Sequence, residues 1–243
     1  RRTKIMLSLI IPCFNEEKNL EKLFENISLL LKNYSQEQVE ILIVDNGSTD
    51  KSNEFIKRNN LYLEKKIKLI EIKNNTGYGN GIYKGILSCK GDFVAWCHAD
   101  LQIDPHDVIK IFLKSKQKLL SEDCIIKGKR TNRNFIDTIF TFGMTILTFV
   151  LFQIKLNDIN AQPKIFKKNF IDKLNNSPKD FSFDFYFLLL ARKEKLNIYE
   201  YPVVWNKRYA GEAKGGGSIG LKIKLTLRTL KFMIKLMKNP KWN

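Results

Sequence analysis

The chain has 243 residues, a mass of 28.4 kDa and 42 Lys and Arg residues against 25 Asp and Glu, which gives a formal charge of +17. Hydrophobic residues at 44% and charged residues at 28% exclude a mainly disordered chain, a collagen-like chain and a disulfide scaffold. From Lys207 to the end, ten Lys and Arg residues accompany one acidic residue. This bias indicates either an anionic partner, such as nucleic acid, a phosphorylated substrate or an anionic membrane, or a solvated basic surface.

Short apolar runs alternate with amphipathic stretches through the first half of the chain, which predicts βαβ units and a parallel sheet. The apolar runs predict strands at Leu7–Ile11, Glu40–Val44, Lys68–Ile72, Asp92–Cys97 and Cys124–Lys127. The amphipathic stretches predict helices at Glu17–Lys32, Asp50–Asn59, Tyr78–Ser88 and Pro105–Leu119. The first apolar run ends in Asn15-Glu16-Glu17 without a cleavage site, so we interpret it as a strand and not as a signal peptide.

The cysteines have no spacing typical of a metal site. The chain contains four of them, at Cys13, Cys89, Cys97 and Cys124. In a chain without a secretory signal we expect them to be reduced and buried.

Polar clusters follow three of the predicted strands, at Pro12–Glu16, Asp45–Ser48 and His98–Gln102. Ligands of parallel sheets bind at the carboxyl ends of the strands, so we expect a binding site there. No GxGxxG follows the first strand and no GxxxxGK[ST] occurs, so neither a dinucleotide-binding fold nor a P-loop is indicated. The glycine-rich segment Thr76–Gly85 follows the third strand and does not by itself identify a phosphate site.

Two stretches of the second half have the character of membrane-contacting helices. Thr138–Ile154 is a run of 17 residues without a charge, whereas a span needs about 20. A span here would separate two halves that we expect to build one site, so we favour an interfacial or buried helix. In Leu221–Lys238 the apolar and the basic residues each recur at spacings of three and four, which predicts a basic amphipathic helix. It can anchor on anionic lipid, or dock on its own domain or on a second subunit.

Two features predict chemistry at the strand ends. Asp100 and Gln102 lie two residues apart after the fourth strand, and their oxygens suit Mg²⁺ or Mn²⁺ bound to a substrate diphosphate. The alternative is a solvated acidic loop. Lys207, Arg208 and Lys214 flank glycines, which suits a mobile loop that closes over phosphates, or else a disordered basic linker.

Several motifs occur in the order seen in family 2 glycosyltransferases. They are LIIPCFNEEKNL at 9–20, IVDNGSTD at 43–50, NTG at 75–77 and ADLQ at 99–102. The motifs EYPVV at 200–204 and RYAGEAK at 208–214 resemble the polyprenol-phosphate branch, typified by dolichol-phosphate mannose synthase. The resemblance covers roughly residues 5–217.

The resemblance implies a GT-A fold, which is an α/β fold with a mostly parallel sheet flanked by helices. This domain would cover residues 1–217, with the basic amphipathic helix over 218–243. It further implies an inverting, metal-dependent transferase that moves a sugar from a UDP- or GDP-sugar to a polyprenyl phosphate. Such an acceptor is already anionic near neutral pH, so it needs positioning by cations more than a general base.

The resemblance also implies roles for single residues of this chain. The implied nucleotide-binding residues are Pro12, Asn15, Glu16, Asp45, Gly77 and Asp100. The implied ligands of Mg²⁺ or Mn²⁺ are Asp100 and Gln102. The implied phosphate- and acceptor-binding residues are Arg130, Lys164, Arg208 and Lys214, and the catalytic set is Asp100, Arg208 and Lys214.

Three features depart from the family pattern. His98 stands where an Asp is frequent, and Asn46 replaces a frequent second Asp. Residues 158–166 replace a segment usually rich in Ser-Gly-Phe-Arg, with Lys164 in place of that Arg. Two alternatives therefore stay open. One is a transferase with a hydroxyl acceptor on a glycan, for which Asp184 lies near the expected base, although a polar residue near a helix start explains it as well. The other is an inactive assembly subunit.

We therefore expect three partners, which are a nucleotide-sugar donor, a polyprenyl phosphate and an anionic membrane surface. A nucleic-acid partner is not expected, because no nucleic-acid motif occurs. We expect a cytoplasmic protein bound peripherally to the inner face of the membrane. The oligomeric state, the sugar and the donor base stay open, and a homo-oligomer is compatible with the sequence.

Overall fold

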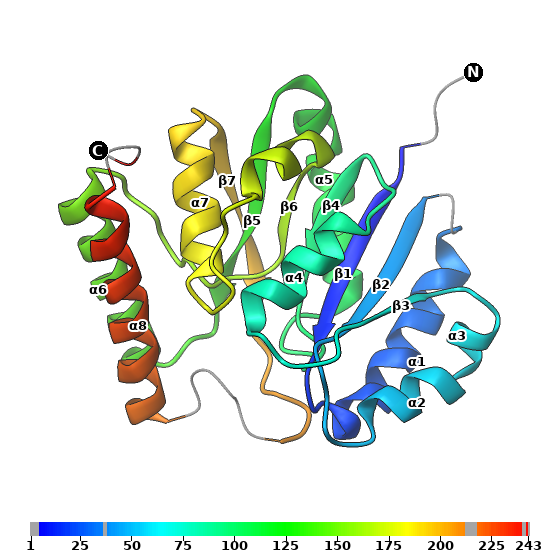
Figure 1. Cartoon of the computed structure of the whole chain (residues 1–243). Helices are drawn as coiled ribbons and strands as arrows, with labels where there is room; N and C mark the ends of the chain where they lie inside the picture. The colour runs from blue at the N-terminus through cyan, green and yellow to red at the C-terminus, as the bar shows by residue number, and fades with distance from the viewer. Residues whose placement is uncertain (1–4, 36–37, 212–217, 240–241, 243) are drawn as a thin grey trace.

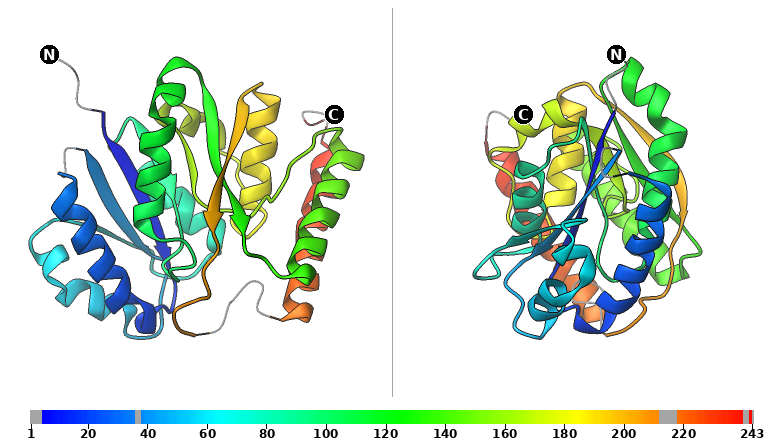
Figure 2. Two further views of the ribbon diagram at one scale, coloured as in Figure 1. Left: turned by 180° about the vertical axis from the view of Figure 1, so that it is seen from behind. Right: turned by 90° about the vertical axis from the view of Figure 1, so that its right-hand side faces the viewer.

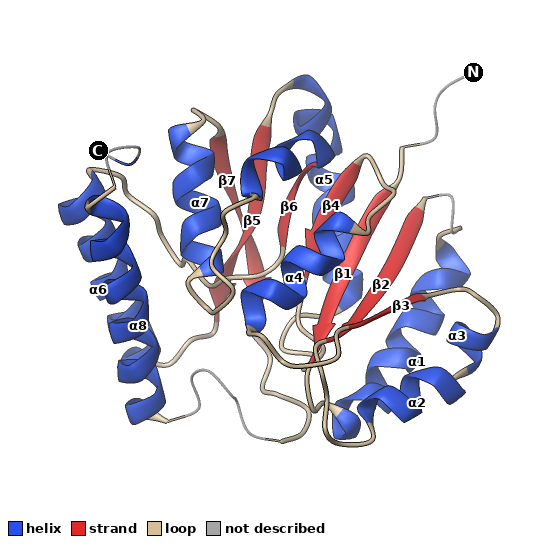
Figure 3. Cartoon of the chain, in the orientation of Figure 1, coloured by secondary structure: helices blue, strands red, loops and turns tan. Residues whose placement is uncertain are grey.

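The computed structural model describes residues 5–35, 38–211, 218–239 and residue 242. A seven-stranded sheet forms its centre, in the order β3-β2-β1-β4-β6-β5-β7 (Figures 1 and 3). The strands are β1 (Leu7–Cys13), β2 (Val39–Asp45), β3 (Lys68–Glu71), β4 (Phe93–Trp96), β5 (Cys124–Thr131), β6 (Lys164–Lys167) and β7 (Asn197–Val204). The helices are α1 (Glu17–Asn33), α2 (Ser52–Arg58), α3 (Asn60–Leu63), α4 (Tyr78–Leu87), α5 (Pro105–Ser121), α6 (Phe135–Phe152), η1 (Lys168–Leu174), α7 (Phe183–Lys193) and α8 (Ile219–Met237).

Neighbouring strands are parallel except around β6, which runs antiparallel to both β4 and β5. This confirms the predicted α/β fold with a mostly parallel sheet. All five predicted strands and all four helices predicted in the first half are present, with ends that differ by a few residues. Three strands inside the sheet, β1, β2 and β4, are nearly continuous apolar runs, because helices cover both faces.

Helices form a layer on each face of the sheet (Figures 1 and 2). α1, α2 and α5 cover one face, and Leu20, Leu23 and Ile27 of α1 point into the core because their spacing places them on one side of the helix. α4 and α7 cover the other face, where Ile82 and Phe187 join a second apolar cluster. All four cysteines are buried and free, as predicted.

α6 and α8 lie side by side at the β7 end of the sheet (Figures 1 and 2). The buried residues of α6 are Thr145 and Thr148 alone, so α6 is not a core helix and its interfacial alternative stays a prediction. Within the described residues, α6 is the one helix with the length and composition of a membrane span. α8 confirms the predicted basic helix, and it turns Met233 and Leu236 into the second apolar cluster.

Candidate active site

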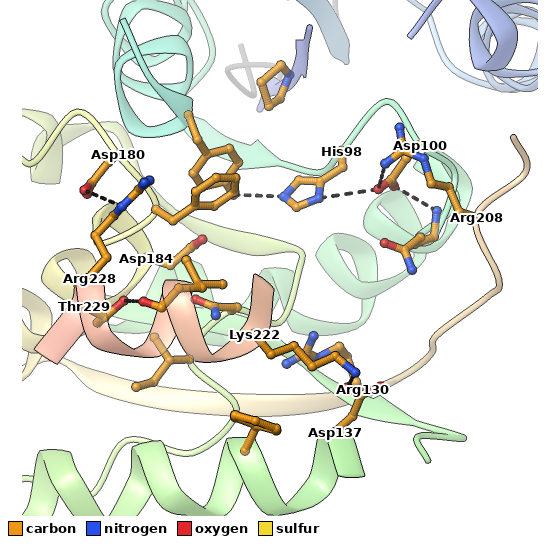
Figure 4. A pocket seen from close by; sticks show the side chains of 18 of the residues that line it. His98, Asp100, Arg130, Asp137, Asp180, Asp184, Arg208, Lys222, Arg228 and Thr229 are labelled. Atoms are coloured by element: carbon orange, nitrogen blue, oxygen red, sulfur yellow. Dashed lines mark hydrogen bonds and ion pairs between the residues drawn. The ribbon is translucent and has the colours of Figure 1, made fainter. Parts of the chain in front are cut away.

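A cavity of about 680 Å³ opens at the carboxyl ends of β1, β2 and β4 (Figure 4). Its walls come from the loops after these strands, from the starts of α4 and α7, and from α6 and α8. This is the edge of the sheet at which the sequence predicts a site. The predicted residues that line it are Pro12, Glu16, Gly77, Asp100, Gln102, Arg130 and Arg208. Lys214, also predicted, lies outside the described residues.

A tight turn after β4 brings the two predicted metal ligands together. Leu101 has a φ of +60°, a left-handed conformation that a bulky side chain seldom adopts. The turn places the backbone N–H of Gln102 3.1 Å from Oδ1 of Asp100, which is 5% exposed. Nδ1 of His98 lies 3.9 Å from Oδ2 of the same carboxylate.

The side-chain amide of Gln102 is paired at both ends in one of its two orientations. In that orientation its nitrogen donates to Oδ2 of Asp100 and its oxygen accepts from the indole N–H of Trp205, each at 3.1 Å. The amide therefore connects the turn after β4 with the segment that follows β7.

Arg208 joins this turn to the end of β1. Its guanidinium forms ion pairs with Asp100, at 3.2 Å, and with Glu16. Figure 4 shows Arg208 approaching Asp100 from the segment after β7. Asn19 donates a second hydrogen bond to Glu16, at 2.5 Å. Three segments that are far apart in the sequence thus meet at one end of the cavity.

The side chains at this end fit a divalent cation. The carboxylate of Asp100 is a hard ligand, and so is the amide oxygen of Gln102, which faces Oδ2 of Asp100 in the other of the two orientations of that amide. Among the described residues, no three or more His, Cys, Asp and Glu side chains form a group that could hold a metal. A cation here would take few protein ligands and complete its shell with diphosphate oxygens and water, as Mg²⁺ usually does at substrate phosphates.

Two predicted nucleotide-binding residues shape the surrounding loops and are not part of the cavity wall. Asn15 accepts a hydrogen bond from the backbone of Thr49 at 2.7 Å. Asp45 accepts from the backbone of Ser48 at 3.0 Å and from the side chain of Asn53 at 2.7 Å. These bonds fix the loops after β1 and β2 beside the cavity.

Asn46 lines the cavity, although the sequence marked it only as a departure from the family pattern. Its nitrogen donates to the carbonyl of Gly77 at 3.0 Å, while its buried oxygen has no hydrogen-bond partner within the described structure. Leaving a buried acceptor unpaired costs about 1–3 kcal/mol, so this oxygen suits a donor group of a bound ligand. Gly77 has a φ of +115°, and a Cβ there would lie 2.4 Å from the carbonyl of Lys179, so the position requires glycine.

Arg130 also lines the cavity, and Asp158 and Trp205 hold its guanidinium. Asp158 accepts hydrogen bonds from the Nε of Arg130, at 2.9 Å, and from one Nη. The indole ring of Trp205 lies 4.9 Å from the Cζ of Arg130. Burial by itself would raise the pKa of Asp158, but hydrogen bonds from Arg130 and its charge bring that pKa below the ordinary value.

Two further cations that the sequence analysis did not single out lie beside Arg130. Arg133 approaches the carboxylate of Asp158 at 3.5 Å, and its buried Nε has no hydrogen-bond partner within the described structure. Lys222 of α8 pairs with Asp137 of α6 at 2.5 Å, and Figure 4 shows this pair next to Arg130. No pattern of charges in the sequence identifies Arg133 as a site residue, because it lies in the loop between β5 and α6.

Lys164 is not in the cavity wall, although the sequence predicts it to bind phosphate. It is 0% exposed, and its ammonium donates to Oδ1 of Asp184, which does line the cavity. Burial lowers the pKa of Lys164, and Asp184 opposes that shift. Gln162 donates to Asp184 at 3.4 Å and to the hydroxyl of Tyr78 at 3.0 Å, and that hydroxyl lies 2.9 Å from Nε2 of His98. A buried polar network thus connects Asp184 with His98.

The geometry agrees with a comparison of the whole chain with known families. A model described as glycosyl transferase family 2 matches residues 8–179. The chain belongs to glycosyl transferase family 2. This family 2 transferase is 28% identical to the dolichyl-phosphate beta-glucosyltransferase ALG5D of Trichomonas vaginalis, over 92% of this chain and 73% of that protein. It is 27% identical to the dodecaprenyl-phosphate galacturonate synthase of Rhizobium johnstonii, over 69% of this chain and 49% of that protein.

Solved structures share the fold of this family 2 transferase. Glucosyl-3-phosphoglycerate synthase from Mycobacterium tuberculosis, in complex with Mn²⁺, uridine diphosphate and phosphoglyceric acid, superposes with a TM-score of 0.71. The match covers 97% of this chain and 80% of that chain at 14% sequence identity. A complex of the same enzyme with Mg²⁺ and uridine diphosphate gives a TM-score of 0.70 at 13% identity, over 95% of this chain and 79% of that chain. The likeness confirms the predicted GT-A fold.

Proposed function

We propose that this family 2 transferase moves a sugar from a UDP- or GDP-sugar to a polyprenyl phosphate at a membrane surface. One observation carries the proposal. A single cavity joins a carboxylate-lined end, at Asp100 and Glu16, to a cationic end, at Arg130, Arg133 and Lys222. The names of the relatives, which act on dolichyl and dodecaprenyl phosphates, support the acceptor class.

The carboxylate-lined end would bind the donor diphosphate. A divalent cation, Mg²⁺ or Mn²⁺, held by Asp100 and Gln102 would stabilise the charge that develops on the departing nucleoside diphosphate. Arg208, paired with Asp100 and Glu16, adds a positive charge on the same side. We include Lys214 in this proposal because it belongs to the sequence motif RYAGEAK at 208–214.

The cationic end would bind the acceptor phosphate. Arg130, Arg133 and Lys222 outnumber the carboxylates of Asp137 and Asp158, so this end keeps a net positive charge. A phosphate monoester, with a second pKa near about 6, would satisfy the unpaired donor of Arg133. One of its oxygens attacks the anomeric carbon while the bond from that carbon to the diphosphate oxygen breaks, which inverts the anomeric centre. No proton needs to be removed from such an acceptor.

The outer faces of α6 and α8 support peripheral binding to the inner face of the membrane. Phe135, Phe142 and Phe149 of α6 are 79%, 65% and 53% exposed. α8 adds exposed apolar residues and a row of lysines and arginines, which is the composition of a helix that lies on anionic lipid. Because α6 packs along the basic helix α8, we place α6 at the membrane–water interface and not across the bilayer.

The hydroxyl-acceptor alternative needs Asp184 as a general base. Asp184 is buried, and its carboxylate already accepts hydrogen bonds from Lys164 and Gln162. Protonating it would leave the fully buried ammonium of Lys164 without its partner, which costs several kcal/mol. A phosphate acceptor avoids this step, so we favour it.

A transfer assay tests the proposal. Radiolabelled UDP- and GDP-sugars are offered one at a time with undecaprenyl phosphate, detergent and Mg²⁺ or Mn²⁺. Asp100→Ala and Arg133→Ala run beside the unmodified protein, with exposed Asp123→Ala and Arg58→Ala as matched controls. The proposal is supported by label that enters the organic phase, is lost with EDTA and in Asp100→Ala, falls in Arg133→Ala at low acceptor concentration, and persists in the controls.

Two other results would contradict it. Transfer to a glycan hydroxyl that is lost in Asp184→Asn would establish the hydroxyl-acceptor alternative. Absence of transfer with any donor, together with absence of metal-dependent nucleotide binding, would indicate an inactive assembly subunit. The departures from the family pattern at His98 and Asn46 would then accompany the loss of activity.

A further inference from the structure

We infer that Lys127 is a positioning residue that holds the backbone of Asp158, so that the carboxylate of Asp158 orients Arg130 in the cavity wall. Glu200 holds Lys127 in turn. The inference rests on the proposed function, in which Arg130 and Arg133 bind the acceptor phosphate.

Lys127 is a buried cation outside the cavity wall. Its side chain is 1% exposed, and it is not among the residues that line the cavity. Its ammonium donates to the carbonyl of Gly128 at 3.0 Å and to the carbonyl of Asp158 at 3.3 Å. It also pairs with Oε1 of Glu200 at 3.2 Å. These contacts match the three N–H donors of an ammonium group, so Lys127 is not placed to bind a substrate itself.

The sheet places Glu200 beside Lys127. β5 and β7 are parallel neighbours, and Lys127 is paired in register with Glu200. Glu200 begins the EYPVV motif at 200–204, to which the proposed function assigns no role. Burial lowers the pKa of Lys127, and the charge of Glu200 opposes that shift. The pair thus keeps an ammonium group in the interior, where an apolar side chain of similar size would avoid the cost of desolvation.

Asp158 has a backbone conformation that needs support from its surroundings. Its φ is +39°, in the left-handed region that residues other than glycine seldom adopt. Its carbonyl accepts hydrogen bonds from Lys127 and from the backbone N–H of Ala161, the latter at 2.9 Å. These two bonds fix the backbone that carries the Asp158 side chain.

The carboxylate of Asp158 fixes Arg130. It accepts the backbone N–H of Arg130 at 2.8 Å, the Nε–H at 2.9 Å and a hydrogen bond from one Nη. Arg133 approaches the same carboxylate at 3.5 Å. A rotation of the Asp158 backbone would therefore move the partner of both guanidinium groups. Lys127 thus acts on two cations of the cavity wall through Asp158.

Two variants separate positioning from stability. Lys127→Met removes the ammonium group and leaves Glu200 unpaired. Lys127→Met with Glu200→Leu replaces the whole pair with apolar side chains, which should recover the stability but not the bond to Asp158. Lys167→Met is the matched control, because Lys167 also lies on a strand of the sheet, pairs with Asp123 at 2.7 Å and is not part of the cavity wall.

Hydrogen exchange of the Nε–H of Arg130 measures the positioning without any substrate. ¹⁵N NMR follows this exchange, and Arg130→Lys assigns the signal by removing it. Lys127→Met and the double variant should both accelerate the exchange about threefold to tenfold, because the bond to Asp158 that protects the hydrogen is weakened. Lys167→Met should leave it unchanged. Thermal unfolding is followed for every variant, and if Lys127→Met does not fold, the double variant carries the test.

Transfer kinetics measure the consequence for the acceptor. Lys127→Met and the double variant should raise the KM for undecaprenyl phosphate about threefold to tenfold, with the KM for the donor unchanged. Lys167→Met should change neither value.

An exchange rate that keeps its unmodified value in Lys127→Met would overturn the inference. So would a double variant that recovers the protection of Arg130 together with the stability, because the role of Lys127 would then be structural only. Accelerated exchange with an unchanged KM for undecaprenyl phosphate would overturn the link to acceptor binding. If the unmodified chain transfers no sugar to undecaprenyl phosphate, the proposed function fails, while the exchange rates still decide whether Lys127 positions Arg130.

Discussion

The ammonium of Lys164 donates a hydrogen bond to Oδ1 of Asp184 inside the wall of the cavity, where the two side chains are 0% and 4% exposed. This pair occupies the place at which the sequence analysis put a phosphate-binding lysine. A buried ion pair is retained only when both charges have partners, because desolvation of either one alone is costly. Lys164 is therefore paired with Asp184, and the cations that we propose to bind the acceptor phosphate are Arg130, Arg133 and Lys222.

Breaking this pair should destabilise the fold. Lys164→Met leaves an unpaired buried carboxylate, and we expect the free energy of unfolding to fall by about 3–5 kcal/mol. Lys164→Met combined with Asp184→Leu should recover most of that loss. Urea denaturation followed by circular dichroism measures both effects. Lys57→Met, in the exposed pair with Glu71, is the matched control and should leave the free energy of unfolding nearly unchanged. A loss in Lys164→Met no larger than the loss in this control would contradict the assignment.

The pair between Asp158 and Arg130 should make stability depend on acid pH. The pKa of Asp158 is lower in the folded chain than its ordinary value of 3.8. Such a depressed pKa stabilises the fold above the unfolded value, and the contribution is lost as the pH falls through the folded value. The difference in unfolding free energy between the unmodified chain and Asp158→Asn should therefore be constant above about pH 5 and shrink below about pH 4. A difference that persists unchanged at about pH 3 would show that the charge of Asp158 is not responsible.

Arg208 should act through the fixed geometry of its guanidinium. It contacts both Asp100 and Glu16, which a single ammonium cannot do in the same way. We expect Arg208→Met to lower kcat about 100-fold or more, because it removes one preorganised charge, and Arg208→Lys to recover only part of that. Single-turnover transfer measurements separate this effect from donor binding. Full activity in Arg208→Lys would indicate that charge alone matters.

Arg133 should contribute to acceptor binding more than to donor binding. Its unpaired buried Nε lies at the cationic end, and a hydrogen bond to a charged group is worth about 1.5–3 kcal/mol. Arg133→Ala should therefore raise the KM for polyprenyl phosphate about tenfold or more, with the KM for the donor unchanged. Initial rates over both substrate concentrations measure the two values. An increase confined to the KM for the donor would indicate that Arg133 binds the donor and not the acceptor.

Replacing the exposed aromatic residues of α6 should detach the protein from membranes. Phe142→Glu with Phe149→Glu adds two charges to the proposed lipid-facing side, and we expect the double variant to stay at the bottom of a flotation gradient with anionic liposomes. Leu63→Glu with Leu87→Glu is the matched control, because these residues are equally exposed but lie on other helices. If both double variants float like the unmodified chain, α6 is not the contact surface.

The hydrophobic pattern was sufficient to predict the first half of the fold. β1 and α1 are found where an apolar run and helical spacing predict them, since β1 is buried on both faces and α1 buries one apolar face. β6 escaped prediction because it is four residues long and contains two lysines, one of which is buried by an ion pair that no local pattern shows. α7 also escaped prediction. It is buried on nearly every side, so its sequence lacks the polar face that would reveal a helical period.

The candidate site was predictable as far as the motifs reach. Asp100, Gln102 and Arg208 meet as the motifs imply, because the ends of parallel strands share one edge of the sheet. Arg133 and Trp205 were not predicted as site residues. Their roles depend on the neighbouring position of β5 and β7 and on the left-handed turn at Leu101, which are tertiary features.

The ion pairs of Arg208 join residues that are 108 and 192 positions apart in the chain. During synthesis, the segments that carry Glu16 and Asp100 leave the ribosome long before Arg208 exists. Contacts of such large sequence separation form late in folding. The carboxylates of Asp100 and Glu16 therefore lack this partner until Arg208 has been made. A nascent or truncated chain that ends before Arg208 lacks the one side chain that pairs with both Asp100 and Glu16 in the described structure.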